Sequence, residues 1–121
     1  MAMRRWLREH PVDVINTHSS TDAWLAALAC ATLGRAAPPL VRTRHISAPV
    51  PDNVLTTWLY TKATRHIVTT GEALRQQLSS GNRFPAMMIT SVPTGIDSRR
   101  FVPGDRKAAQ SALGLDRSFR Y

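Results

Sequence analysis

The chain has 121 residues, 43% of them hydrophobic, which suits one globular domain or a part of one, and no apolar run is long enough to span a bilayer. Sixteen Lys and Arg against eight Asp and Glu give a formal charge of +8, which favours anionic partners such as nucleotides, lipid headgroups or nucleic acid, although a solvated basic surface explains it equally well. The single cysteine, Cys30, excludes an internal disulfide and indicates a reducing, cytoplasmic location.

The first third of the chain predicts two helices separated by a strand. The expected ranges are Met3–His10 for the first helix, Val12–Ile15 for the strand and about 20–33 for the second helix. Pro11 ends the first helix because proline cannot continue its hydrogen bonds. The spacing from Ser19 to Asp22 is that of a capping box, and Gly34 is placed to end the second helix. Three apolar side chains are expected to form the buried side of that helix: Trp24, Leu25 and Leu28.

The remaining residues continue the same alternation. Further strands are predicted at Leu40–Thr43, Arg65–Thr69 and Met87–Val92. Further helices are predicted from Asn53, from a second capping box spanning Thr69 to Glu72, and over Asp105–Leu113 before Gly114. The expected inward side chains of the first two are Val54, Leu55, Trp58 and Leu59, then Leu74 and Leu78. Alternating strands and helices indicate an α/β fold, a Rossmann-like parallel sheet with right-handed crossovers and helices on both faces.

Each predicted strand ends in a polar loop. The loops are Asn16–Ser20, Arg42–His45, Thr69–Glu72 and Pro93–Asp97. In a parallel sheet these loops share the carboxyl edge, where open α/β sheets bind their ligands. The sequence therefore predicts a common rim that carries His18, His45, Gly71 and Gly95.

Four segments, in this order, resemble glycosyltransferase family 4 of the GT-B fold: "DVINTHSS", "LVRTRH", "RHIVTTGEALRQQL" and "ITSVPTGIDSRRFVPGD". The last is the most specific, because the family has a Pro-Asn-Gly-Val/Ile-Asp turn followed by Phe and Pro, although Thr94 stands where the family has Asn. The resemblance implies that residues 1–115 form a partial, acceptor-side N-terminal domain, an incomplete GT-B domain, and that residues 116–121 lead into a second domain.

The resemblance also implies a function. The whole enzyme would be a retaining glycosyltransferase of the hexosyltransferase type, moving a sugar from a nucleotide-diphosphate sugar to a sugar or lipid acceptor, either lipid-linked or a polysaccharide precursor. Micromolar donor binding needs about −8 kcal/mol. A single helix-terminus contact contributes roughly 0.3–1 kcal/mol, so this chain alone is expected to be inactive.

The resemblance gives His45 the catalytic position, where its imidazole would hydrogen-bond the sugar or stabilise charge at the anomeric centre; an ordinary loop histidine is the alternative. The expected substrate-binding residues are His18, Ser19, Arg42, Arg44, Thr70, Gly71, Glu72, Thr94 and Gly95. The structural alternatives are helix capping for Ser19 and Glu72, a salt bridge for either arginine, and a simple turn for Gly95, which is expected at positive φ.

No cofactor, metal site or nucleic-acid partner is expected. The histidines and Cys30 lack metal-ligand spacing, and no nucleic-acid reader motif is present. Trp6 beside Arg4 and Arg5 suggests peripheral contact with the inner face of a membrane. The alternative function is a non-catalytic, basic α/β module that binds nucleic acid or a protein partner.

Overall fold

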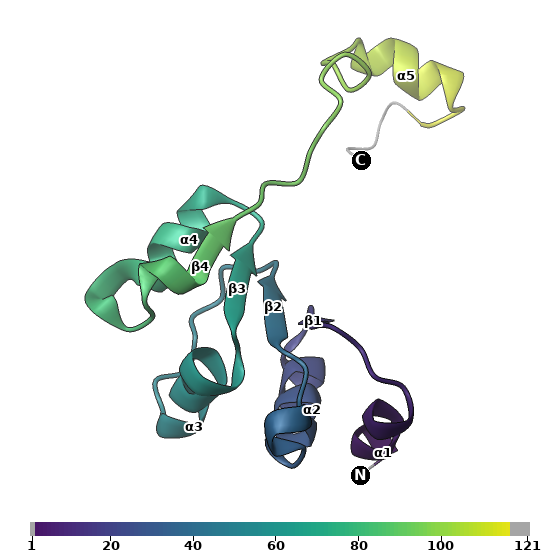
Figure 1. Ribbon diagram of the computed structural model, residues 1–121. Helices are drawn as coiled ribbons and strands as arrows, with labels where there is room; N and C mark the ends of the chain where they lie inside the picture. Colours follow the sequence, from purple (N-terminus) through teal and green to yellow (C-terminus); the bar gives the residue numbers. More distant parts are fainter. Residues whose placement is uncertain (1, 117–121) are drawn as a thin grey trace.

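Four short strands form one parallel sheet in the order β1-β2-β3-β4 in the computed structural model, which describes residues 2–116 (Figure 1). The strands are β1 (Ile15–Thr17), β2 (Leu40–Arg44), β3 (His66–Thr69) and β4 (Ile89–Ser91). Every neighbouring pair is parallel, so the predicted α/β sheet is confirmed and all four strands point their carboxyl ends to one edge. Apart from Asp116, the expected lead-in segment lies outside the described residues.

The helices follow the strands in alternation. They are α1 (Ala2–Glu9), α2 (Ser20–Ala31), α3 (Val54–Trp58), the π-helix η2 (Leu59–Ala63), α4 (Glu72–Ser79) and α5 (Arg106–Ala112). Short 3-10 turns lie at Gly34–Ala36 (η1), Ser80–Asn82 (η3) and Ala86–Met88 (η4). Gly34 adopts positive φ just after α2, as predicted, and Gly114, predicted to end the last helix, also adopts positive φ just after α5.

The core occupies one face of the sheet. Leu40, Ile67 and Ile89 share that face through the strand register and pack against α2, η2 and α4. On the other face, Val68 is only half-buried and Thr90 is exposed. Helices on both faces were predicted, and for the described residues this is wrong. A sheet built in chain order, with crossovers of the usual right hand, carries its connecting helices on one side.

Alanines, not the predicted leucines, form the buried side of α2. Its fully buried residues are Ala23, Ala26, Ala27 and Ala29. Leu25 and Leu28 are 53% and 42% exposed, so that part of the prediction is wrong. Trp24 is half-buried and stacks on Trp58 at 6.2 Å between ring centroids. Small side chains allow the helix axis to approach the sheet closely, which leaves the larger leucines on the outer surface.

The helix that begins after Asn53 also differs from its predicted phase. Asn53 caps α3 as expected, but Val54 and Leu55 are 84% and 67% exposed. The buried side chains are Thr56, Leu59 and Tyr60, so the prediction is confirmed for Leu59 and wrong for Val54 and Leu55. From Leu59 the helix continues as the π-helix η2.

Three strands begin later than predicted, β3 by one residue, at His66, and β1 and β4 by more. β1 begins at Ile15, whose N–H donates to Pro39 O, and Val12 and Val14 remain exposed. β4 begins at Ile89, and the methionines expected in its core lie in η4, where Met87 is 89% exposed.

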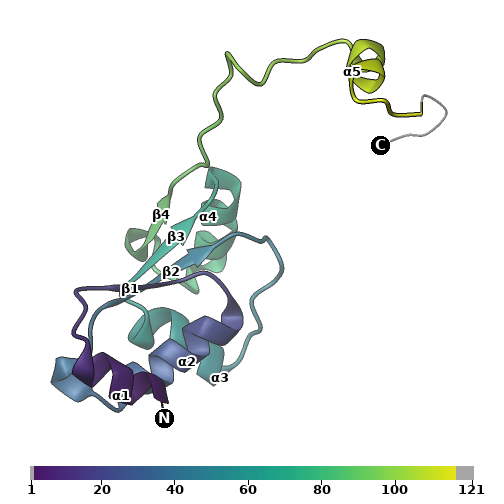
Figure 2. The same ribbon diagram turned by 90° about the vertical axis from the view of Figure 1, so that its right-hand side faces the viewer.

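The chain leaves the sheet after β4. Residues 92–105 form an extended arm that carries α5 away from the sheet and its helices (Figures 1 and 2). Asp105 caps α5 through the N–H of Lys107. Gly95 lies in this arm and is not among the glycines at positive φ, so its expected turn conformation is wrong. No residue after Ile89 belongs to the core cluster of the described residues.

Candidate functional site

The loops after β1 and β2 meet through two histidines. His18 Nδ1 lies 2.9 Å from His45 Nε2, and the two rings stack with centroids 5.2 Å apart. One ring donates the shared proton and the other accepts it. Both side chains are exposed, so the pair faces solvent at the carboxyl edge of the sheet. The sequence prediction that these residues share a rim is confirmed.

Asp22 fixes the loop that carries His18. It accepts hydrogen bonds from the backbone N–H groups of His18 and Ser19 at 2.8 Å each, and the Ser19 hydroxyl completes a capping box. Partial burial alone would raise the pKa of Asp22, but the hydrogen bonds from His18, Ser19 and Ala23 together lower it below the ordinary value. The capping role of Ser19 is therefore confirmed. The α2 N-terminus already holds a carboxylate of its own.

Two buried arginines lie on β2, the strand that leads into His45. Arg42 and Arg44 project from the same side of β2 and are 5% and 8% exposed. Arg42 donates to Ser20 Oγ at 3.2 Å, and its guanidinium lies 4.6 Å from the centroid of the Tyr60 ring. Arg44 donates to the Tyr60 hydroxyl at 2.8 Å and to the Ala48 carbonyl.

Neither arginine forms an ion pair with a carboxylate of the described residues. In addition, Arg42 Nη1 and Arg44 Nε are buried without a hydrogen-bond partner there. Burial lowers the pKa of Arg42, and the neighbouring charge of Arg44 lowers it further, while Tyr60 and Asp22 act in the opposite direction. Buried charges in proteins are normally paired, and these two arginines lack a counter-charge among the described residues.

The third loop is built differently from its prediction. Gly71 is the N-cap of α4 and has an extended backbone, while Thr69 Oγ1 donates to Gly71 O. The expected capping box from Thr69 to Glu72 is therefore wrong. Glu72 instead pairs with Arg75 at 2.6 Å, and the hydrogen bond from Arg75 lowers the pKa of Glu72.

The other predicted substrate residues lie farther along the rim. Thr70 and Gly71 are half-buried at the end of β3. Thr94 and Gly95 are exposed on the arm that leaves the sheet after β4. In the described residues, no hydrogen bond connects these four residues to the histidine pair. The predicted site residues that contact one another therefore lie in β2 and in the loops after β1 and β2.

A hollow of about 190 Å³ lies between these two loops. Its lining residues are His18, Ser19, Ser20, Arg42, Thr43, Arg44, His45 and Ile46. Tyr60 contacts both arginines, through its hydroxyl to Arg44 and its ring to Arg42, and the sequence did not predict this role. It lies in the π-helix, outside every edge loop, and only the fold brings it to β2. The hollow combines two guanidinium groups, two imidazoles and two serine hydroxyls, which together can donate several hydrogen bonds to an anionic group.

Two further structural findings concern the described residues. No three His, Cys, Asp or Glu side chains in residues 2–116 lie close enough to hold a metal ion together. None of the helices there has the length and hydrophobicity that crossing a bilayer requires.

Comparison with known sequences gives a consistent result. Residues 1–100 match the profile of Glycosyltransferase Family 4. The chain is 33% identical over 120 residues to the D-inositol 3-phosphate glycosyltransferase of Mycobacterium leprae (strain Br4923), covering 85% of the chain and 26% of that protein. It is 34% identical over 125 residues to the enzyme of the same name from Mycolicibacterium vanbaalenii, covering 89% and 26%. The Mycobacterium tuberculosis H37Ra protein is 36% identical over 120 residues, with 85% and 24% covered. The chain thus spans about a quarter of the length of these curated relatives.

Proposed function

The chain belongs to Glycosyltransferase Family 4, and on that premise we propose that it forms the acceptor-side wall of a cytoplasmic, retaining glycosyltransferase that uses a nucleotide-diphosphate sugar. The acceptor is a phosphorylated polyol. The relatives named above are D-inositol 3-phosphate glycosyltransferases, and their name supports an acceptor of this kind.

The buried arginine pair is the observation that carries this proposal. Arg42 and Arg44 are nearly inaccessible to solvent and have no carboxylate partner among the described residues. A guanidinium group matches the geometry of phosphate oxygens and can bind them with two parallel hydrogen bonds. A phosphate in the hollow between the first two loops would supply the missing negative charge. The free polar atom Arg42 Nη1 would then gain an acceptor.

The histidine pair supplies the groups that we expect to contact the transferred sugar. We assign to His45 a hydrogen bond to the transferred sugar or to the charge that develops at its anomeric centre. His18 lies 2.9 Å away and holds the His45 ring through their shared proton. Asp22 fixes the backbone of His18 in turn, so the loop that carries this ring is in place before a substrate arrives.

The chain by itself is expected to bind the donor weakly. Micromolar affinity needs about −8 kcal/mol, which is far more than the isolated rim contacts supply. We therefore expect no sugar transfer when the purified chain is mixed with a nucleotide sugar and D-inositol 3-phosphate. Product detected by mass spectrometry would contradict this part of the proposal.

Binding of the acceptor tests the main part. In an NMR titration, D-inositol 3-phosphate should bind the chain at least about tenfold more tightly than unphosphorylated inositol. Arg42→Gln should remove most of that preference. Arg99→Gln is the matched control, because Arg99 is an exposed arginine on the arm. Equal affinity for the two ligands, or an unchanged preference in Arg42→Gln, would overturn the acceptor assignment.

A further inference from the structure

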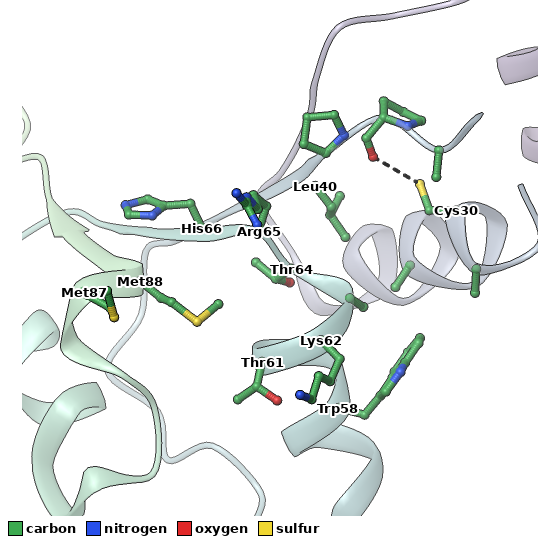
Figure 3. Close-up of a pocket in the computed structure, with 16 residues that line it drawn as sticks. Cys30, Leu40, Trp58, Thr61, Lys62, Thr64, Arg65, His66, Met87 and Met88 are labelled. Atoms are coloured by element: carbon green, nitrogen blue, oxygen red, sulfur yellow. Dashed lines mark hydrogen bonds between the residues drawn. The ribbon is translucent and has the colours of Figure 1, made fainter. Parts of the chain in front are cut away.

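A second hollow, of about 820 Å³, opens at the amino-terminal edge of the sheet, whereas the histidine rim lies at the carboxyl edge. Figure 3 shows the residues that line this second hollow. The end of α2, the π-helix η2, the start of β2 and β3, and the turn η4 enclose it. None of its lining residues takes part in the proposed acceptor site. It therefore requires an explanation of its own, and this explanation does not depend on sugar transfer.

The charge in this hollow has one sign. Lys62, Arg65 and His66 line it, and no Asp or Glu does. Lys62 and Arg65 are exposed and form no ion pair with a carboxylate of the described residues. His66 is held by a 2.8 Å hydrogen bond to Thr90 Oγ1. Two permanent cations without counter-charges at one opening favour an anionic ligand.

The interior of the hollow holds an unsatisfied polar atom. Thr64 is 2% exposed, and its Oγ1 has no hydrogen-bond partner among the described residues. Figure 3 shows Thr64 in the middle of the lining residues, between η2 and the start of β3 at His66. Buried hydroxyls in proteins normally have partners, so this atom marks a place where a ligand group could complete a hydrogen bond.

The remaining lining is apolar and adaptable. Leu40 and Trp58 form part of one wall, and Met87 and Met88 lie on the opposite side of the opening in Figure 3. Met87 is 89% exposed, and an unbranched methionine side chain can reposition over a bound group. The wall beside Trp58 is the π-helix η2, and π-turns occur frequently at functional sites.

We propose that this amino-edge hollow binds an amphiphilic anion, which is a phosphate or carboxylate attached to an aromatic or short alkyl body. The anionic group lies between Lys62 and Arg65, and the apolar body lies against Trp58, Leu40 and Met88. Such an anion has two possible sources, a soluble metabolite or the headgroup region of a membrane lipid. The chemistry of recognition is the same for both.

Cys30 gives a site-specific measurement of this binding. It is the only cysteine in the chain and lines the hollow, with its Sγ 3.9 Å from Pro38 O. Burial raises the pKa of the Cys30 thiol, so its modification by a neutral maleimide is best followed at mildly alkaline pH. Naphthyl phosphate should slow this modification in a saturable way. Naphthol and inorganic phosphate, which each lack one half of the ligand, should protect the thiol at least about tenfold less effectively.

Variants and vesicles complete the test. Arg65→Gln should weaken protection by naphthyl phosphate about tenfold, whereas Lys107→Gln, an exposed change on α5, should leave it unaltered. Protection by phosphatidylglycerol vesicles, but not by phosphatidylcholine vesicles, would assign the lipid source; protection by naphthyl phosphate alone would assign the soluble one. Equal protection by naphthol and naphthyl phosphate, full protection in Arg65→Gln, or no protection by any probe would overturn the proposal.

Discussion

The Asp22 carboxylate has two structural roles. It caps α2 through Ser19 and it accepts the backbone N–H of His18, whose ring contacts His45. The same side chain therefore stabilises the helix and fixes the backbone of the loop that carries His18. A change at Asp22 is expected to alter both the stability of the chain and the orientation of the rim.

The lowered pKa of Asp22 predicts a pH-dependent effect of Asp22→Asn. A carboxylate whose folded pKa is depressed stabilises the fold above its unfolded pKa, near 3.8, and loses that contribution as pH falls through the folded value. At neutral pH the variant should be about 1 kcal/mol less stable. The difference should shrink as the pH falls below about 4. Urea denaturation across this pH range measures both quantities, and a difference that stays constant with pH would contradict the assignment.

Unlike the Asp22 carboxylate, the charge of Arg42 does not stabilise the fold. Its burial without a carboxylate partner means that the charged form opposes folding, as the lowered pKa indicates. Arg42→Gln should therefore lower the free energy of unfolding by no more than about 1 kcal/mol, even though the residue is 5% exposed. A loss of about 3–5 kcal/mol, typical when one member of a buried ion pair is removed, would show that Arg42 is a paired structural residue.

At the scale of the elements, β3 shows how unequal the two faces of the sheet are. Ile67 is fully buried in the core cluster, whereas the next residue, Val68, is half-buried on the face that carries no helix. Ile67→Ala should cost about 2–5 kcal/mol of unfolding free energy, and Val68→Ala less than about 1 kcal/mol. Similar losses for both variants, measured by denaturant unfolding, would mean that the second face is also packed.

Strand direction and the rim could be predicted from the sequence, because hydrophobic runs and polar loops alternate with clear start and stop residues. The inward face of a helix was harder. In α2 the buried residues are alanines, which carry little hydrophobic signal, so Leu25 and Leu28 were expected inside although they are exposed. In α3, Val54 and Leu55 were expected inside and are exposed, and no local pattern indicated that the helix continues as the π-helix η2 after Trp58.

Part of the candidate site could also be predicted from the sequence, and part could not. The positions of His18 and His45 followed from the strand ends. The burial of Arg42 and Arg44 and their contacts with Tyr60 did not, because they depend on how η2 packs behind β2. Such long-range packing is invisible in a single sequence.

At the scale of the whole molecule, the sheet with its helices is one unit and the arm with α5 is another segment. The core cluster ends at Ile89, and the arm joins the sheet through the bond from Val92 N–H to Thr69 O. Limited proteolysis within residues 93–105 should therefore leave the unfolding free energy of the sheet unchanged within about 0.5 kcal/mol. A large drop in the thermal midpoint after cleavage would show that α5 packs on the sheet in solution.

The account depends most on one claim, that the carboxyl-edge rim receives a phosphate between its buried arginines and its histidine pair. Isotope-labelled NMR spectra can follow the ring nitrogens of His18 and His45 and the guanidinium of Arg42 while D-inositol 3-phosphate is added. We predict concerted, saturable shifts of all three groups, which inositol without phosphate does not reproduce. Unchanged signals at the rim, or shifts confined to the exposed arginines of α1 and the arm, would contradict the claim.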